Sequence, residues 1–215
     1  MPFVFTHVVH FLYRDSSKNL DIALEQFKEL RHKGMVLPVG ILNMILSAGA
    51  ERGDIDRTLA LLGEFPRNNA VPNADSMGFA FESLGRHLSR RTLNPAGPEL
   101  RSACLEYADS FLTMMDEYGI EPNHHIIREY VELLCHAHEI DTASKVIMES
   151  VENEWPVCSK AIYVVSMANV KQRQDYEMAR RIANCAAQPL PFLMENIEKH
   201  ELRQSQALES NDTTI

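Results

Sequence analysis

The sequence lacks several features that assign a protein to a class. No apolar run approaches the ~20 residues that a membrane-spanning helix needs. The N-terminus "MPFVFTHVVHFLYRD" has neither the basic start nor the small-residue cleavage site of a secretory signal. Only four of the 215 residues are cysteines, and no C-x-x-C pair occurs, which favours free thiols over disulfides or a thiolate metal site. With 45% hydrophobic and 24% charged residues, we expect a soluble globular protein with no membrane association.

Motifs for catalysis and cofactor binding are missing as well. The sequence contains no phosphate-binding glycine loop, no nucleophile elbow, no paired-carboxylate motif, and no H-x-E with C-x-x-C of a zinc deaminase. Histidines and a cysteine cluster between residues 124 and 138, but no second ligand pair follows at zinc-finger spacing. We therefore expect that the protein is not an enzyme and uses no metal, cofactor or small-molecule substrate.

Positive charge is scarce, because 21 lysines and arginines oppose 30 aspartates and glutamates, which gives a net charge of −9. The net charge is +1 over residues 1–98, −10 over 99–155 and 0 over 156–215. Nucleic-acid-binding modules usually display a basic face, and none is evident here. The acidic segment is either the solvated outer face of two helices or a docking surface for a basic protein. Trp155, at its end, is either a staple between hairpins or an exposed anchor.

What the sequence does contain is a helix-ending signal that recurs. In "EYGIEPN" at 117–123, Gly119 can adopt the left-handed conformation that stops a helix, and Pro122 prevents the helix from continuing. Similar signals occur at 33–38 ("KGMVLP"), 68–73 ("NNAVPN") and, less clearly, 153–157 ("NEWPV"). These signals divide the chain into units.

A small residue recurs at one place in each unit. Ala23 and Thr58 are 35 residues apart, Ala108 and Ala143 are again 35 apart, and Ala179 follows 36 later. The step from Thr58 to Ala108 is 50 residues, which is one period with 15 residues added. An apolar residue follows each small one four positions later, and such a pair lies on one face of a helix.

Each unit contains another helical pattern before this one. In "GILNMILSAGAERGDID" the apolar residues form one helix face, Gly53 ends that helix and Asp54 can cap the next. Related patterns occupy 124–141 and 159–177. A hairpin of two short helices cannot bury its own apolar stripe, but stacked hairpins can. The sequence therefore predicts an all-α, right-handed α-solenoid of about five helical hairpins with 35-residue repeats.

These units resemble the pentatricopeptide repeat family. The shared features are an Asn early in the first helix, "G-D" between the helices, an Ala near the start of the second helix, and "G-I-x-P-N" at the end. The tetratricopeptide repeat is the nearest competitor, but its aromatic and Pro signature is absent. The predicted units are about 4–38, 39–73, 74–123 with an insertion, 124–158 and 159–188, followed by a C-terminal polar helix or disordered tail at 189–215.

The resemblance implies binding of single-stranded RNA, with one base recognised by the fifth and the last residue of each unit. Asn43 and Asn73 form a complete amide pair, a combination that the family associates with a pyrimidine. The alternative for Asn43 is a groove-lining amide without a ligand. The other pairs are Gly78 with Asn123, which offers one amide, Arg128 with Cys158, which suits a phosphate or protein contact, and Val8 with Pro38, which offers no side-chain hydrogen bond.

The insertion in the third unit contains a basic stretch, "GRHLSRR" at 85–91, followed by "TLNPAGPEL". Arg86, Arg90 and Arg91 are candidate contacts for a phosphate or a partner. The Pro- and Gly-rich remainder predicts an exposed loop. The segment is either a solvated loop or a functional insertion, because long insertions in compact repeats often carry function.

We expect a non-catalytic organellar protein that binds single-stranded RNA of an organellar transcript and assists RNA processing, stability or translation. The alternative is a protein–protein scaffold, or a mitochondrial-ribosome-associated subunit that holds ribosomal proteins or a ribonucleoprotein with its groove and acidic flank. The family usually acts in mitochondria or plastids. The resemblance therefore implies a mitochondrial (or plastid) location on the matrix side, although no transit peptide is visible in the sequence.

Overall fold

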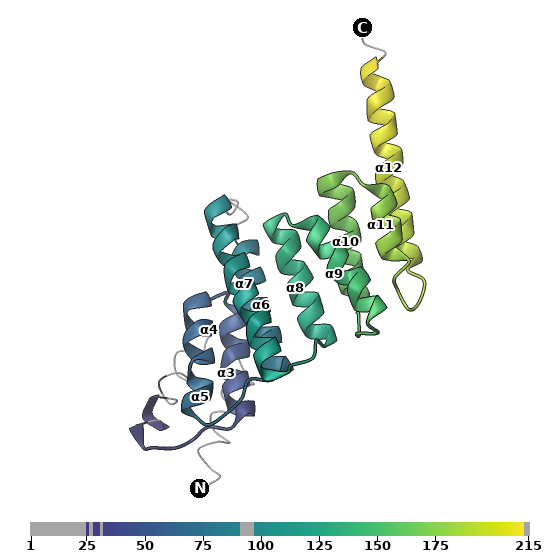
Figure 1. The fold of residues 1–215 in the computed structure, drawn as a ribbon. Helices are drawn as coiled ribbons and strands as arrows, with labels where there is room; N and C mark the ends of the chain where they lie inside the picture. The colour runs from purple at the N-terminus through teal and green to yellow at the C-terminus, as the bar shows by residue number, and fades with distance from the viewer. Residues whose placement is uncertain (1–24, 26–27, 31, 91–96, 213–215) are drawn as a thin grey trace.

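The computed structural model describes residues 25, 28–30, 32–90 and 97–212, with side chains as far as residue 207. Every regular element within these ranges is helical, and no strand occurs among them (Figure 1). None of the described helices is both long and apolar enough to cross a membrane. The prediction of an all-α architecture is confirmed.

The helices form hairpins that are stacked one after another (Figure 1). The first described hairpin joins α3 to α4 and the short α5, the second joins α6 to α7, the third joins α8 to α9, and the fourth joins α10 and the π-helical η1 to α11. Helix α12 packs against α11. The bounds are α3 Val39–Glu51, α4 Ile55–Leu62, α5 Glu64–Arg67, α6 Ala74–Ser89, α7 Pro98–Tyr118, α8 His124–Ala137, α9 Ile140–Glu152, α10 Ser159–Ala168, η1 Asn169–Arg173, α11 Tyr176–Ala183 and α12 Pro191–Asp212.

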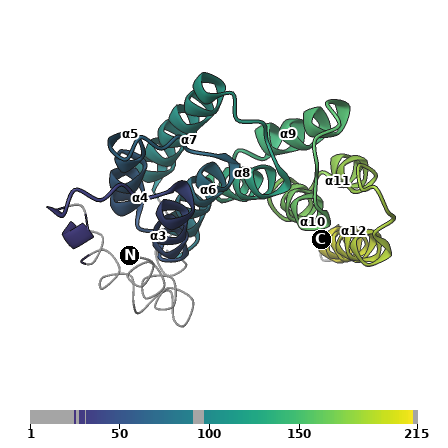
Figure 2. The ribbon, with the colours of Figure 1, turned by 90° about the horizontal axis from the view of Figure 1, so that it is seen from below.

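The hairpins place their helices in two rows (Figure 2). Helices α3, α6, α8 and α10 pack against one another in sequence and form the first-helix row. Helices α4, α5, α7, α9 and α11 form the second-helix row on the other side. Because each hairpin contacts mainly its neighbours, the arrangement is a solenoid. Most of the predicted unit 4–38 lies outside the described residues.

The recurring stop signal ends helices as the sequence predicts. Gly119 has φ 62° and ψ 39°, in the left-handed region, and the backbone N–H of Ile120 donates to the carbonyl of Met115 over 2.8 Å. Asn123 then caps α8, because its side-chain oxygen accepts hydrogen bonds from two backbone N–H groups, one of them that of Ile126 at 2.9 Å. The end of one hairpin thus sets the start of the next.

The turn inside a hairpin uses a second local signal. Gly53 has φ 59° after the end of α3, and Asp54 caps α4 by accepting a hydrogen bond from the backbone N–H of Arg57 over 3.2 Å. The turn before α11 follows the same plan, with Gln174 at φ 56° and Asp175 as the cap. A left-handed residue followed by an acidic cap therefore reverses the chain in both hairpins.

The small residues at the repeating position are buried wherever the structure describes them. Thr58, Ala108, Ala143 and Ala179 are each at most 1% exposed. A small side chain lets the second helix of a hairpin approach its neighbours without leaving a void. Thr58 also joins α4 to α6, because its hydroxyl donates a hydrogen bond to that of Ser83 over 2.9 Å.

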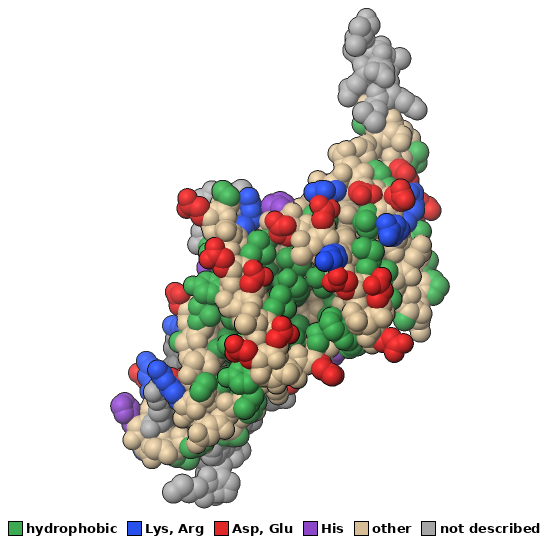
Figure 3. Space-filling model, in the orientation of Figure 1, with side chains coloured by type: hydrophobic (Ala, Val, Ile, Leu, Met, Phe, Trp, Pro, Cys, Tyr) green, Lys and Arg blue, Asp and Glu red, His purple; other side chains and the backbone are tan. Residues whose placement is uncertain are grey.

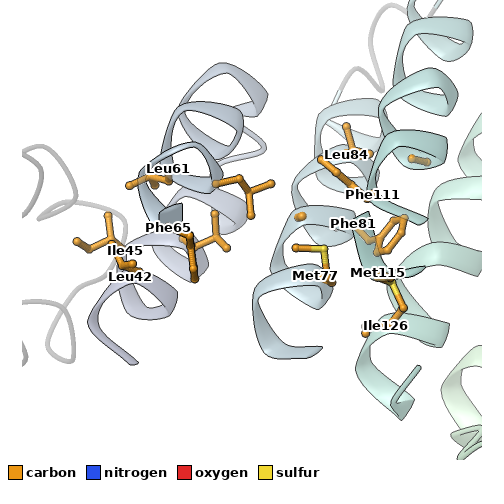
Figure 4. Close-up of a cluster of buried hydrophobic side chains, with 14 of the residues drawn as sticks. Leu42, Ile45, Leu61, Phe65, Met77, Phe81, Leu84, Phe111, Met115 and Ile126 are labelled. Carbon is orange, nitrogen blue, oxygen red and sulfur yellow. The ribbon is translucent and has the colours of Figure 1, made fainter. Parts of the chain in front are cut away.

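Apolar side chains form two cores that meet at α8. The N-terminal core extends from α3 to α8 and contains Phe81 and Phe111, whose rings meet edge to face with centroids 5.6 Å apart (Figure 4). The C-terminal core continues from α8 to α12. Ile126 of α8 belongs to the first core and Ile127 to the second. Helix α8 therefore divides its sides between the two cores.

The insertion of the third unit lengthens a helix. Helix α7 has 21 residues, compared with 13 in α9, the equivalent helix of the next hairpin. Residues 91–96 lie outside the described residues, so the contact assigned to Arg91 stays a prediction. The exposed loop predicted for 92–100 is wrong at its end, because residues 98–100 form the first turn of α7.

The four cysteines all lie within the described residues, and none of them forms a disulfide. Cys104 and Cys135 are buried, whereas Cys158 and Cys185 are partly exposed. Burial raises the pKa of the Cys135 thiol to about 12, with a smaller contribution from the charge of Glu132. A thiol with so high a pKa is inert as a nucleophile at neutral pH.

Candidate nucleic-acid interface

The fifth residues of the predicted units lie on the first-helix row. They are Asn43 on α3, Gly78 on α6, Arg128 on α8 and Tyr163 on α10. Sequence reasoning did not single out Tyr163, although it follows Arg128 by 35 residues, which is the repeat spacing. Its side chain is 38% exposed. An exposed aromatic ring is a platform on which a base can stack.

Asn43 and Asn73, the predicted amide pair, are in direct contact. Asn43 Nδ2 donates to Asn73 Oδ1 over 2.9 Å, and Ser76 Oγ donates to Asn43 Oδ1 over 2.6 Å. Asn73 also caps α6 by accepting a hydrogen bond from the backbone N–H of Ser76. Asn43 is only 8% exposed, whereas Asn73 is exposed. Asn73 Nδ2 has no hydrogen-bond partner among the described residues.

Gly78 lies beneath the imidazole of His125, a residue of the next hairpin. A Cβ on Gly78 would lie 2.4 Å from His125 Nδ1, so the two helices are spaced for a glycine at this point. The His125 ring contacts the edge of Phe79 with ring centroids 5.3 Å apart. The side chain that occupies the predicted position of Gly78 is therefore that of His125, and the partner position, Asn123, uses its side chain to cap α8.

His125 also lies between two carboxylates of neighbouring hairpins. Its Nε2 is 3.8 Å from a carboxylate oxygen of Glu82 on α6 and 3.8 Å from one of Glu129 on α8. Arg86 pairs with Glu82 at 3.0 Å, and Arg128 Nε donates to Glu129 over 2.6 Å. Arg128, which was predicted to contact a phosphate or a protein, is thus engaged with a carboxylate of its own helix.

The pKa values of Glu82 and Glu129 are shifted in opposite directions. Burial alone would raise the pKa of Glu82, but the nearby imidazole of His125 and the hydrogen-bonded guanidinium of Arg86 outweigh it and lower the pKa. Burial is stronger at Glu129, where it raises the pKa despite the hydrogen bond from Arg128. The cluster therefore holds one carboxylate firmly ionised beside one that takes up a proton more readily.

Positive charge on the first-helix row is matched by acidic partners. Lys160 of α10 pairs with Glu132 of α8 at 2.6 Å, in addition to the pairs of Arg86 and Arg128 with glutamates. An RNA phosphate that contacts any of these three cations would compete with a carboxylate. This row is therefore close to neutral rather than basic.

Arg90 lies at the C-terminal end of α6 and contacts the end of α3. Its guanidinium donates to the backbone carbonyls of Arg52 and Glu51 at the end of α3. His87 Nδ1 lies 2.9 Å from the carbonyl oxygen of Gly53 in the same turn. The predicted phosphate or partner contact at Arg90 thus coincides with a bond that ties two hairpins together.

Glu82, His125 and Glu129 are also the one group of metal-ligating side chains found within the described residues. One potential ligand atom from each lies within 4.8 Å of the others. Structural zinc sites have four protein ligands, usually cysteine and histidine. Here only three side chains converge, and arginines already engage both carboxylates.

The fold has counterparts among solved structures. The PPR (pentatricopeptide repeat) domain of Arabidopsis thaliana protein-only RNase P 1, in complex with tRNA, matches with a TM-score of 0.65 and 16% identity over 91% of this chain and 97% of that one. The chain has a pentatricopeptide-repeat fold. The pentatricopeptide repeat protein PPR10, in complex with an 18-nucleotide psaJ RNA element, matches with the same TM-score and identity over 96% of this chain. This match covers 28% of the PPR10 chain.

A form of PPR10 with three cysteines changed to serine matches the pentatricopeptide-repeat fold of this chain equally well. No protein-family model matches the sequence, and no curated protein matches it at a significant level.

Proposed function

We propose that the chain binds single-stranded RNA along its first-helix row and catalyses no reaction on it. The fold supports this function, because pentatricopeptide-repeat structures in complex with RNA match almost the whole chain. The observation that carries the proposal is the Asn43–Asn73 contact of 2.9 Å. Repeat proteins of this kind recognise one base per unit through two or three side chains, and these two amides come from the fifth and last residues of one unit.

The two amide side chains are already held in position in the absence of RNA. Ser76 holds Asn43, and Asn73 is fixed as the cap of α6, so little side-chain entropy is lost on binding. The Nδ2 group of Asn73 has two N–H donors for the carbonyl oxygens of a pyrimidine. Three hairpins further on, Tyr163 of α10 offers a surface on which another base can stack.

The charges on this row set the expected strength of binding. For single strands, the logarithm of the binding constant falls with the logarithm of salt concentration by about 0.7 for each phosphate neutralised. Arg86, Arg128 and Lys160 could neutralise at most three phosphates, and each already has a glutamate partner. We therefore expect modest affinity with a slope no steeper than about −2.

In the cell, the proposed role is to assist processing, stability or translation of an organellar transcript in mitochondria or plastids. The family resemblance of the repeat units supports this role. The corresponding test is crosslinking in cells followed by sequencing of the bound RNA. Enrichment of organellar transcripts would support the role, and enrichment of cytosolic transcripts alone would contradict it.

Fluorescence anisotropy with labelled pyrimidine-rich and purine-rich single-stranded RNA tests the binding itself. Loss of the Asn43 amide should weaken binding of the pyrimidine-rich RNA about tenfold, which corresponds to ~1.4 kcal/mol. Asn43→Ala is therefore compared with Asn184→Ala, which removes an exposed amide at the end of α11. Circular dichroism confirms that both variants are folded. The proposal is wrong if wild type binds neither RNA at low salt, or if the two variants lose affinity equally.

A further inference from the structure

A groove opens on the second-helix row between α7 and α9. Both helices pack on α8, which forms the floor, and they do not pack extensively on each other. The next two helices of that row, α9 and α11, do pack together. Between α7 and α9 the structure has a cavity of about 230 Å³. Hydrophobic side chains gather in this hollow, which faces the viewer in Figure 3.

The groove, here named the α7–α9 groove, is lined mainly by apolar side chains. Leu112 of α7 and Val146 of α9 form its two walls, and Ile120 and Tyr130 contribute from the unit end and the floor. Trp155, just after α9, completes the lining and is 40% exposed. It is the chain's one tryptophan. An exposed apolar groove of this kind is typical of an interaction site.

Acidic side chains flank the apolar lining. Asp116 on α7 and Glu149 on α9 line opposite sides of the groove. Helix α7 carries five acidic residues and one basic residue, and α9 carries three acidic residues and one basic residue. Burial raises the pKa of Tyr130, and the negative charge of the nearby Asp109 raises it further. The negative charge therefore extends to Tyr130 on the floor of the groove. The surroundings of the groove are therefore both apolar and negative.

A buried hydroxyl adds a polar point to the lining. Ser150 of α9 lines the groove and is fully buried, and its oxygen has no hydrogen-bond partner among the described residues. Buried polar atoms without a partner are uncommon in folded proteins.

We propose that the α7–α9 groove binds a basic amphipathic helix of a protein partner. Two parallel walls and an apolar floor suit a helix laid in a groove with its apolar face inward. Lysines and arginines on the flanks of that helix would then face Asp116 and Glu149. The pocket is smaller than the roughly 300–1,000 Å³ of most small-molecule sites, which favours side chains of a partner as the occupant.

Two other occupants fit less well. RNA is disfavoured, because its phosphates would meet carboxylates on both walls. A second copy of the chain is disfavoured, because its segments outside the acidic region carry net charges of only +1 and 0. The groove lies on the second-helix row, whereas the proposed RNA site lies on the first-helix row (Figure 2). The two proposals therefore stand or fall separately.

Trp155 provides a direct measurement of occupancy. The probe is a synthetic 14-residue amphipathic peptide of leucine and lysine that lacks tryptophan, titrated into the full chain. Binding in the groove should shift the Trp155 emission to shorter wavelength, because the indole becomes buried. The control peptides are a scrambled leucine–lysine sequence without an apolar face and a leucine–glutamate version of the same helix. Both should bind at least tenfold more weakly.

Matched variants locate the site. Asp116→Lys with Glu149→Lys should weaken peptide binding more than tenfold, and Glu177→Lys with Glu198→Lys, which changes two exposed glutamates on α11 and α12, should leave it unchanged. Val146→Glu should also abolish the emission shift, whereas Leu202→Glu, at a position 60% exposed on α12, should not.

Three results would overturn the proposal. The first is equal binding of the lysine and glutamate peptides. The second is equal weakening by the groove variants and their matched controls. The third is concentration-dependent dimerisation in analytical ultracentrifugation that Val146→Glu removes, because the occupant would then be a second copy of the chain.

Discussion

His125 of α8 occupies the space that a side chain on Gly78 of α6 would need. A Cβ on Gly78 would lie 2.4 Å from His125 Nδ1 and 2.9 Å from two carbons of the same ring. Helices α6 and α8 belong to different hairpins, so this pair sets how closely two units stack. The contact also fixes His125 between Glu82 and Glu129.

The first prediction concerns this pair. Gly78→Ala should destabilise the protein by about 1 kcal/mol, because an overpacking cost of about 1–3 kcal/mol exceeds the gain of about 1 kcal/mol from alanine in a helix. In a His125→Ala background the space is open, and the same change should stabilise by about 1 kcal/mol. Urea unfolding of the four proteins measures both effects. An unchanged sign in the two backgrounds would show that His125 does not restrict position 78.

The second prediction separates backbone strain from crowding. Gly53 and Gly119 both have positive φ, of 59° and 62°, so alanine at either position should cost about 1–2 kcal/mol. A Cβ at Gly53 would in addition lie 2.9 Å from the backbone nitrogen of His87, whereas nothing lies within 4 Å of one at Gly119. Gly53→Ala should therefore cost at least about 1 kcal/mol more than Gly119→Ala.

Thermal and urea unfolding of the two alanine variants give this difference. Effects on the unfolded chain are the same for both substitutions and cancel in the comparison. Equal losses would mean that α6 moves away from the turn at Gly53 without cost.

The third prediction uses the opposite pKa shifts of Glu82 and Glu129. A lowered pKa at Glu82 contributes stability above its unfolded value of 4.5, and this contribution is lost as pH falls through the folded value. A raised pKa at Glu129 means that the folded protein holds the proton more tightly. Its stability therefore falls as pH rises from 4.5 through the folded pKa.

Glu82→Gln should accordingly lower stability more at pH 7 than at pH 4, relative to wild type. Glu129→Gln should show the reverse trend, with its stability relative to wild type improving as pH rises. The measurement is the free energy of unfolding in urea for the three proteins at each pH. If both variants follow the same trend, the two carboxylates do not have opposite shifts.

Much of the fold could be predicted because its signals are local. Gly119 and Pro122 act on the backbone at their own positions, and Asp54 caps a helix within three residues. The small residues at 58, 108, 143 and 179 mark a repeated packing position, so their spacing alone indicates the period. The sequence lengths of the hairpins then imply stacking, because no single hairpin can bury its own apolar stripe.

The candidate site was less accessible to sequence reasoning, because its side chains take their roles from neighbouring hairpins. Nothing in the sequence around Gly78 indicates that His125, 47 residues later, lies over it. The hydrogen bonding of Asn43 likewise depends on Ser76 of the next unit. Tyr163 is different, since extending the 35-residue spacing from Arg128 would have found it.

The α7–α9 groove was foreseen only in part. The acidic segment indicated either solvated helix faces or a docking surface, and the structure places eight of its acidic residues on α7 and α9, which line an apolar groove. The spacing of these two helices could not be deduced, because it depends on how both pack on α8. Trp155 lines the groove and is partly exposed, which favours the anchor over the staple.

Helix α8 gives one side to each of the two cores, through Ile126 and Ile127. Because α8 is shared in this way, it couples the two cores. Neither core can loosen without disturbing the packing of the other. Helix α8 also carries His125, which contacts α6, and it forms the floor of the α7–α9 groove. A partner bound on one side of α8 would thus restrain the packing of both cores.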